Sequence, residues 1–349
     1  MRPPDMSTKA GIVYAPHELC TSFDVRHRII VLFAVFLLAL IGETVAMEPK
    51  PIPVIFDTDI GTDIDDTWAL ALILASPELD LKLVVTDSGD TMERARITAK
   101  FLEASGRDDV PIGVGIPGGK IPLPQAPWAQ DYNLDSYRGE IHKDGVGVLI
   151  DVIRRSDEEV VLIVVGPAPN ISEALQRDPS IAGKARVVAM SGSVDKGYNS
   201  NPEPAPEYNV RASVAGSQAM YGAGWNLLIA PLDTAGQVKL KGELYRRLLG
   251  SDAPMVHALL DNYRVWAPEF RWGRYDPAIE SSTLYDALAV ALAYDEALCT
   301  IEDLKLEVTD DGFTRRKASG NPVRAALGWP DGGREAFEQF LVERLTSYR

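Results

Sequence analysis

The sequence predicts an α/β protein with a Rossmann-like fold: an open, mostly parallel sheet flanked by helices, with a helical C-terminal part. From residue 54 onward, short apolar runs alternate with helical stretches and the links between them are short, which is typical of βαβ units. An aspartate-rich turn follows the first apolar run directly, as expected at the carboxyl edge of a parallel sheet, where ligands bind. Beyond residue 233 the pattern becomes mostly helical.

The first half of the chain supplies most of the predicted βαβ units. Short apolar runs bounded by turns indicate buried strands, and longer periodic stretches between them indicate helices. In order, we expect a strand at 54–56, a helix at 68–75, a strand at 81–85, a helix at 91–104, a strand at 110–114, a helix at 146–155, a strand at 160–165 and a helix at 171–176. Residues 115–144 are rich in Pro, Gly and aromatics without a period, which favours a functional or mobile loop.

The second half completes the sheet and adds the helical part. The apolar runs continue with two further central strands before the pattern changes. We expect strands at 185–190 and 227–230, helices at 240–249, 254–263 and 285–297, a hairpin across 306–323 and a final helix at 334–347. No internal repeat and no linker requires a second domain.

The N-terminal 46 residues are predicted to be an extension with a secretory signal. Arg26 and Arg28 precede an apolar run at 29–42, and small residues follow up to Ala46, which is the order of a cleavable signal. The run is shorter than the ~20 residues of a comfortable membrane span. We therefore expect cleavage near Ala46 and a periplasmic or secreted protein without a stable membrane span; an uncleaved anchor is the alternative.

Composition limits the partners of the mature chain, which we expect to be one catalytic domain at 47–349. The 349-residue chain is 46% hydrophobic, enough for one large α/β domain. A net charge of −15 argues against nucleic acid or anionic membranes and agrees with a small ligand. The two cysteines, Cys20 and Cys299, give no disulfide framework in the mature chain.

Five aspartates within ten residues follow the first predicted strand. They are Asp57, Asp59, Asp63, Asp65 and Asp66. Carboxylates at this density repel one another unless a cation or a bound polyol lies among them. Oxygen ligands of this kind suit Ca²⁺ or Mg²⁺ rather than Zn²⁺. An acidic surface loop with one aspartate as the helix N-cap would explain only one or two of the five.

The acidic stretch resembles the N-terminal signature of the nucleoside hydrolase family (inosine-uridine-preferring type), Asp-x-Asp-x-Gly-x-Asp-Asp followed by a small and apolar helix. Two departures are visible. Ile60 stands where the family usually has Pro, and two extra residues separate Gly61 from the Asp65-Asp66 pair. We align that pair with the family's Asp-Asp because the small and apolar residues follow it at the right distance.

Four later segments extend the resemblance over nearly the whole mature chain. The matching segments are Gly166-Pro167-Ala168-Pro169-Asn170 for Gly-Pro-Leu-Thr-Asn, Met190-Ser191-Gly192-Ser193 for Met-Gly-Gly, Glu207-Tyr208-Asn209 for Glu-Phe-Asn, and Tyr285-Asp286 for His-Asp. Taken alone, the first, third and fourth of these segments have plainer interpretations as a polar turn or a helix cap.

The resemblance implies a Ca²⁺ site and a catalytic base. By position in the motifs, the metal ligands are Asp59, Asp66, Asp286 and the backbone carbonyl of Val165, which together with waters and sugar hydroxyls give the six to eight oxygens that Ca²⁺ takes. The metal lowers the pKa of a bound water, and Asp59 takes its proton.

The resemblance also implies how ribose is held. Asp65 and Asn209 bind the 2′- and 3′-hydroxyls, and Glu207 binds the remaining hydroxyls together with Asn201. Asn199 competes with Asn201 for this role because the spacing is three residues longer here. Each sugar hydroxyl both donates and accepts hydrogen bonds, so a pocket that combines Asp and Glu with Asn satisfies them all.

Four residues depart from the family pattern or extend it. Tyr285 replaces the histidine near the departing base, and Asp90 replaces an asparagine near the metal-bound water. His142 lies in a loop that resembles His-Gly-x-x-Gly but is one residue out of register; we predict a catalytic role, with a plain surface histidine as the alternative. Trp272, among several aromatics, is predicted to stack on the base, with core packing as the alternative.

The sequence therefore predicts a Ca²⁺-dependent hydrolase that splits ribonucleosides into free base and ribose and that forms a homodimer or homotetramer, as the family usually does. A non-catalytic nucleoside- or ribose-binding protein is one alternative, because the histidine is replaced. A hydrolase of a related N-riboside is another. A phosphohydrolase of the Asp-x-Asp type is disfavoured by Gly61, where that superfamily expects Thr or Val.

Overall fold

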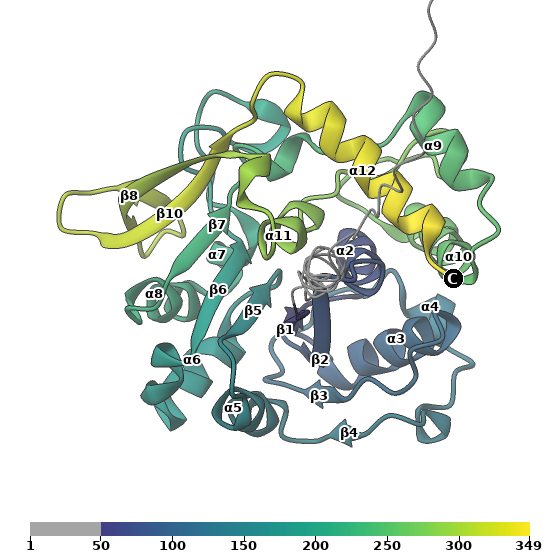
Figure 1. Ribbon diagram of the computed structural model, residues 1–349, viewed down its shortest axis with the longest axis horizontal. Helices are drawn as coiled ribbons and strands as arrows, with labels where there is room; N and C mark the ends of the chain where they lie inside the picture. The colour runs from purple at the N-terminus through teal and green to yellow at the C-terminus, as the bar shows by residue number, and fades with distance from the viewer. Residues whose placement is uncertain (1–49) are drawn as a thin grey trace, which may run out of the picture. The chain divides into compact units, whose positions relative to one another are not determined.

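A ten-stranded sheet runs through the part of the chain described by the computed structural model, residues 50–349 (Figure 1). The strands are β1 (Ile52–Thr58), β2 (Leu79–Thr86), β3 (Ile112–Val114), β4 (Ile141–His142), β5 (Val160–Val164), β6 (Ala185–Met190), β7 (Leu227–Ala230), β8 (Thr300–Val308), β9 (Thr314–Arg316) and β10 (Asn321–Gly328). The predicted secretory signal and Cys20 lie outside the described residues. Within these residues, no helix has both the length and the apolar character needed to cross a membrane.

The strand order places β1 at a topological switch point. The order is β4-β3-β2-β1-β5-β6-β7-β10-β8-β9, and every pair from β4 to β7 is parallel. The chain first runs outward from β1 to β4 and then returns to β5 on the other side of β1. Asp57, near the end of β1, pairs with Val85 of β2 and Val164 of β5. Ligands bind at such a position in open α/β sheets, outside the carboxyl ends of the strands.

Helices cover both faces of the sheet. They are α2 (Asp65–Leu74), α3 (Thr91–Ala104), α4 (Ala126–Ala129), α5 (Gly145–Arg155), α6 (Pro169–Arg177), α7 (Tyr208–Ala212), α8 (Val214–Gly222), α9 (Gly242–Leu249), α10 (Pro254–Glu269), α11 (Ala287–Leu292) and α12 (Gly333–Ser347). Apolar residues of α2, α3, α10, α11 and α12 form one core, and those of α5, α6 and α8 form the other.

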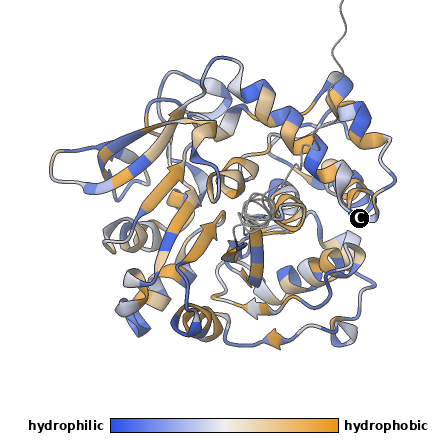
Figure 2. Cartoon of the chain, in the orientation of Figure 1, coloured by the Kyte–Doolittle hydropathy of each residue, from blue (hydrophilic) through white to orange (hydrophobic). Residues whose placement is uncertain are grey.

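Strand β1 shows why both faces must be covered. Val54 and Phe56 point into the first core and Ile55 into the second, and all three are fully buried. The central strands are hydrophobic along most of their length (Figure 2), as expected of parallel strands buried on both faces. The α/β prediction is confirmed.

The C-terminal part differs from the expected helical region because it also extends the sheet. β10 pairs in parallel with β7, and β8 and β9 continue the sheet in antiparallel fashion. The expected hairpin at 306–323 begins earlier, since β8 starts at Thr300. Exposed charges at Glu302 and Asp303 hide this strand in the hydropathy pattern. α7 and α8 were not predicted, because their Ala, Gly and Ser residues give little apolar periodicity.

The long loop at 115–144 is fastened at several points. It contains α4, a short 3₁₀ turn at Leu134–Ser136 and the edge strand β4. The Ser88 amide donates to the Ile116 carbonyl at 3.0 Å, and the Gln125 amide donates to the Gly61 carbonyl at 3.2 Å. The loop therefore packs against the aspartate-rich turn after β1.

Candidate active site

The acidic turn, residues 57–66, connects β1 to α2 at the switch point. The Thr58 hydroxyl, at the end of the strand, donates to Asp66 Oδ1 at 2.5 Å and accepts from the Ile60 amide at 3.0 Å. Gly61 has φ of +120°, and Leu123 and Ile97 lie so close that a Cβ would crowd them. Strand, turn and helix start are thus held together, which fixes the direction of the carboxylates.

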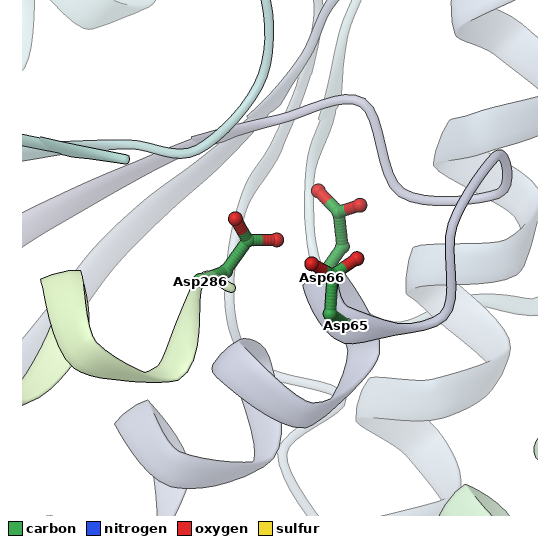
Figure 3. Close-up of side chains that lie close together, drawn as sticks. All are labelled: Asp65, Asp66 and Asp286. Atoms are coloured by element: carbon green, nitrogen blue, oxygen red, sulfur yellow. The ribbon is translucent and has the colours of Figure 1, made fainter. Parts of the chain in front are cut away.

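Three of the carboxylates meet between the first turns of two helices (Figure 3). Asp65 and Asp66 begin α2, and Asp286 immediately precedes α11; one carboxylate oxygen from each lies within 4.8 Å of the others. We call this group the three-carboxylate cluster. All three side chains are buried, and burial together with the neighbouring carboxylates raises the pKa of each well above its ordinary value.

The cluster brings together residues to which the family resemblance gives different roles. Asp66 and Asp286, both expected as metal ligands, come together. Asp65, expected to bind ribose, joins them. Asp59 is buried beside them, and its charge contributes to the raised pKa of Asp66 and Asp286, but it is not part of the closest group of oxygens.

A fully buried arginine from α3 holds Asp59. Arg94 Nε donates to the Ser88 carbonyl at 2.7 Å, and Nη1 donates to the carbonyls of Asp59 and Ile60, the latter at 2.9 Å. Nη2 lies 3.9 Å from Asp59 Oδ2 and donates to the Thr62 hydroxyl at 2.9 Å. Burial raises the pKa of Asp59, and the guanidinium charge opposes that rise. Sequence reasoning missed Arg94, although a basic residue on the apolar face of a predicted helix was a usable signal.

Asp57 and Asp87 are two further buried carboxylates at the ends of neighbouring strands. Asn170 Nδ2 donates to Asp57 Oδ2 at 2.8 Å, yet burial still raises the pKa of Asp57 to about 7. Asp87, fully buried directly after β2, has no hydrogen-bond partner on either oxygen among residues 50–349. Its position is close to Gly166, where a Cβ would lie 2.4 Å from Asp87 Oδ2. Asp87 was not predicted, although its place directly after a strand matches that of Asp57.

Glu207 and Asn209 lie beside the carboxyl end of β5. Glu207 caps α7: its carboxylate accepts from the amides of Asn209 at 2.7 Å, Gly192 at 3.1 Å and Val210 at 3.2 Å. Burial raises the pKa of Glu207 to about 7 against these bonds. Asn209 Nδ2 donates to the Val165 carbonyl at 2.7 Å. These three predicted residues are therefore brought together, and no donor among residues 50–349 bonds to the side-chain oxygen of Asn209.

The segment before Glu207 is anchored by a residue that was not predicted. Asp233, buried just after β7, accepts from the amides of Val194, Asp195 and Lys196 at 2.9, 2.7 and 3.0 Å. This three-amide arrangement fixes the start of the loop that leads to Glu207. The only sequence signal was its position after a strand.

Aromatic side chains lie next to the cluster. The Tyr285 ring packs edge-on against Tyr198 with centroids 6.2 Å apart, and burial together with nearby Tyr275 and acidic side chains raises the pKa of the Tyr285 hydroxyl. Trp266 stacks on Phe270, and their centroids are 4.3 Å apart. Trp272 is 63% exposed and touches Phe270 edge-on, so its ring is free for a ligand but lies at the surface.

The structure does not bring His142 to the cluster. His142 ends the edge strand β4, faces Glu140 at 3.6 Å, and lines an open surface groove with Pro53 and Lys82. Strands β3 and β2 separate β4 from β1, which leads into the acidic turn. The structure therefore places His142 at the edge of the sheet and not among the clustered carboxylates, and its catalytic role stays a prediction.

Asp90 and the predicted asparagine are not part of the three-carboxylate cluster. Asp90 is exposed and caps α3 by accepting from the Glu93 amide at 3.0 Å. Asn201 is exposed and accepts from the Glu203 amide at 3.1 Å; its competitor Asn199 is exposed as well. In this structure the side chains of Asp90 and Asn201 bond within local turns, the plainer interpretation of such residues.

The family comparison agrees with this geometry. The family model described as inosine-uridine preferring nucleoside hydrolase matches residues 54–329. The chain belongs to this nucleoside hydrolase family. Membership makes it an N-ribosyl hydrolase, and the match spans every residue of the site described above.

Curated relatives and solved structures extend the likeness over most of the chain. The pyrimidine-specific ribonucleoside hydrolases RihA of Enterobacter sp. (strain 638) and of Klebsiella pneumoniae are each 28% identical over 327 residues, which is 85% of this chain and 98% or 99% of theirs. A plant nucleoside hydrolase structure is 25% identical with a TM-score of 0.72 and covers 85% of this chain and 99% of its own. A purine-preferring ribonucleoside hydrolase from Gardnerella vaginalis, at 20% identity and a TM-score of 0.66, shares the fold over 84% of this chain and 99% of its own.

The donor set of the cluster fits a hard divalent cation. Its three carboxylates offer only oxygen ligands at mutual distances that one ion can bridge. Burial and mutual repulsion disfavour three bare charges here, as the raised pKa values show. A cation among these oxygens would offset that repulsion.

Proposed function

We propose that this chain hydrolyses the N-glycosidic bond of ribonucleosides, with Ca²⁺ as the cofactor and pyrimidine ribonucleosides as preferred substrates. The observation that carries the proposal is the buried three-carboxylate cluster at the switch point of a nucleoside hydrolase fold. The pyrimidine preference rests on the RihA relatives, which are pyrimidine-specific by name.

The chain's own residues provide a route for the reaction. Asp65, Asp66 and Asp286 would hold the cation, which when bound lowers the pKa of the attacking water. Asp59 accepts the proton of that water. Its backbone carbonyl is fixed by Arg94, so the carboxylate is held in place before substrate arrives. The surrounding carboxylates stabilise the positive charge that develops on the ribose ring.

Glu207 and Asn209 are positioned to orient the ribose. Both are buried and fixed by backbone contacts, and the carboxylate of Glu207 has acceptor capacity beyond its three amide bonds. The free side-chain oxygen of Asn209 accepts from one ribose hydroxyl. Holding the sugar in one orientation contributes to the rate because the reacting atoms are then already aligned.

Tyr285 occupies the place next to the departing base. Its raised pKa keeps the hydroxyl protonated at neutral pH, so it donates a hydrogen bond to the base rather than a full proton. The leaving base must therefore take its proton from water or leave as an anion that the aromatic side chains surround.

Release of free ribose from a panel of ribonucleosides tests the proposal. We expect Ca²⁺-dependent release, with uridine and cytidine faster than inosine and adenosine. Faster purine cleavage would contradict the pyrimidine preference and leave the hydrolase proposal intact. No release from any member would contradict hydrolysis of common ribonucleosides and would direct the search to related N-ribosides.

A non-catalytic nucleoside binder is the second candidate. It is favoured by one observation: of the histidines at 50–349, His142 faces a surface groove and His257 bonds the Ser251 carbonyl, so neither is near the cluster. Asp59→Asn separates the two functions. A hydrolase loses most of its rate and keeps nucleoside binding in calorimetry, whereas a binder shows binding without turnover in both forms.

We also propose that the protein is exported, periplasmic or secreted, after cleavage near Ala46, and that it forms a homodimer or homotetramer. Mass spectrometry of the mature chain from its native host should give a start close to Met47. An N-terminus at Met1 would contradict cleavage. Sedimentation equilibrium gives the subunit number, and a monomer at micromolar concentration would contradict the assembly.

A further inference from the structure

Gln125, in the long loop, contacts the acidic turn and α2 on both sides of the pair formed by Asp65 and Asp66. Its side-chain nitrogen donates to the carbonyl of Asp63, which precedes the pair. Its side-chain oxygen accepts from the hydroxyl of Thr67, which follows the pair, at 2.9 Å. A side chain from a distant segment therefore spans the start of the helix that carries two members of the three-carboxylate cluster.

The Gln125 side chain is itself held in one orientation. It is fully buried, and its oxygen accepts a second hydrogen bond from Asn262 Nδ2 of α10 at 2.7 Å. A backbone carbonyl only accepts hydrogen bonds, so the nitrogen of the side-chain amide has to face Asp63, and the oxygen then faces Asn262 and Thr67. The backbone amide of Gln125 also donates to the Gly61 carbonyl at 3.2 Å. One residue thus joins the acidic turn, α2, α10 and the long loop.

The first turn of α2 has no side-chain cap of its own. Ile64 precedes the helix, and its apolar side chain makes no capping hydrogen bond. The Thr58 hydroxyl bonds the Asp66 carboxylate from the end of β1, and Gln125 bonds the next residue, Thr67, from the side of the long loop. The contacts of Gln125 therefore help to fix where α2 begins.

The position of α2 matters because two helices share the cluster. Asp65 and Asp66 begin α2, Asp286 precedes α11, and one carboxylate oxygen from each lies within 4.8 Å of the others. A bound cation requires metal–oxygen distances that hold to about 0.2 Å, so a small shift of α2 against α11 separates the ligands. Side chains that orient metal ligands without touching the ion typically change its affinity by about 10- to 100-fold.

We propose that Gln125 is a positioning residue, which sets the affinity of the three-carboxylate cluster for Ca²⁺ by holding the start of α2. The inference rests on the proposed function for the identity of the cation. Gln125 is not itself a ligand, because its side-chain oxygen already accepts from Thr67 and Asn262. The long loop is thereby a structural part of the cation site, although it gives no carboxylate to the cluster.

Calorimetric titration of the chelator-treated protein with Ca²⁺ alone measures this role. Gln125→Met keeps the length of the side chain and removes its hydrogen bonds, so we expect the Ca²⁺ dissociation constant to rise at least about tenfold. Gln130→Met is the matched control, because Gln130 lies in the same loop and is exposed. The control should leave the dissociation constant unchanged.

Two variants of Thr67 test the same contact from the side of α2 and perturb the fold less. Thr67→Val keeps the shape of the side chain without the hydroxyl, whereas Thr67→Ser keeps the hydroxyl that donates to Gln125. We expect weaker Ca²⁺ binding in Thr67→Val and an affinity close to that of the unmodified chain in Thr67→Ser. This pair decides the matter if Gln125→Met does not fold.

Thermal unfolding in excess chelator separates positioning from support of the fold alone. Loss of a buried hydrogen bond lowers the Tm in both cases. A lower Tm with an unchanged Ca²⁺ affinity, in Gln125→Met and in Thr67→Val, overturns the inference, because Gln125 then supports only the fold. An equal loss of affinity in Thr67→Val and Thr67→Ser also overturns it, because the hydroxyl is then not the contact that matters.

Ribose release separates this inference from the proposed function. Ca²⁺-dependent release by the unmodified chain, with equal Ca²⁺ affinity in Gln125→Met and Thr67→Val, overturns the inference alone. An unmodified chain that binds no Ca²⁺ overturns the inference together with the proposed cofactor.

Discussion

The surroundings of the Asp286 carboxylate are set by a segment that is distant in the sequence. As a lone aspartate before a short helix it would be an ordinary N-cap, yet its side chain makes no capping bond to α11. It faces Asp65 and Asp66 from the start of α2 instead (Figure 3). An uncapped, buried carboxylate beside two others is costly unless a cation is bound.

Replacement of Asp286 tests this directly. Asp286→Asn keeps the volume and removes one anionic ligand, so we expect weaker Ca²⁺ binding in calorimetry and ribose release slowed by more than about 100-fold. Asp295→Asn is the matched control, because Asp295 is exposed and caps the next short turn. Equal Ca²⁺ affinity in Asp286→Asn and the unmodified chain would exclude Asp286 as a ligand.

Tyr285 gives a second test at the scale of one residue. Tyr285→Phe removes only the hydroxyl, so kcat should fall about tenfold, the value of one hydrogen bond, while KM changes little. Tyr294→Phe, whose hydroxyl lies 3.4 Å from Ser76 Oγ away from the cluster, should leave kcat unchanged. An unchanged kcat in Tyr285→Phe would show that the hydroxyl does not act on the departing base.

The sequence pointed to the polar side chains that line the acidic turn and α7, but not to the residue that holds the turn. Asp66, Asp286, Glu207 and Asn209 follow strands or begin helices, where motif positions are visible in one dimension. Arg94 was missed, because its partners are mostly backbone carbonyls that only the folded turn brings together. His142 was expected near the site, but it lies in the edge strand β4, which β3 and β2 separate from β1.

At the scale of elements, α3 acts as the support of the acidic turn. Arg94 reaches from its first turns to four separate groups of the turn and of the β2–α3 link. A buried guanidinium that lost these partners would be unpaired, and a turn that lost the guanidinium would have free carbonyls and an unopposed Asp59 charge. Helix and turn are therefore expected to be stable only together.

Arg94→Met tests this coupling. We expect the free energy of unfolding to fall by about 3 kcal/mol, as when one partner of a buried ionic network is removed, and ribose release to fall with it. Arg96→Met on the same helix loses only a surface pair with Glu93 and should change stability by less than about 0.5 kcal/mol. Urea unfolding followed by tryptophan fluorescence measures both. Equal stabilities would contradict the support role.

The bounds of a strand could be predicted where helices cover both of its faces, and less well elsewhere. The central strands β1, β2, β5 and β6 appear as apolar runs because helices cover both faces. β4 and β8 lie at or near the edges of the sheet, where polar residues are tolerated, so their sequences give no such run. The 115–144 loop was expected as functional or mobile, and its contacts through Gln125 fix part of it against the site.

For the whole molecule, the buried carboxylates link stability to pH and to the cation. The pKa of Asp57 and of Glu207 is raised to about 7 in the folded protein, from about 4 in the unfolded chain. The folded state therefore binds more protons between these values, so stability is greatest below pH 4 to 5 for these groups and is lost as pH rises toward 7.

Thermal unfolding in excess chelator checks the sign. We expect a higher Tm at pH 5 than at pH 8 without the cation. Ca²⁺ should raise the Tm at pH 8 more than at pH 5, because a ligand of the folded state stabilises it by mass action and competes with protons. A chelated protein whose Tm rises from pH 5 to pH 8 would contradict the raised pKa values.

Release of ribose with and without the cation tests most directly whether the three-carboxylate cluster is the catalytic centre. The mature chain from Met47 would be incubated with uridine in Ca²⁺, then in excess chelator, and then after Ca²⁺ is restored. We expect release, loss of release and recovery in the unmodified chain, and little release in Asp286→Asn under all three conditions. Release that persists in chelator and in Asp286→Asn would show that hydrolysis does not depend on this cluster.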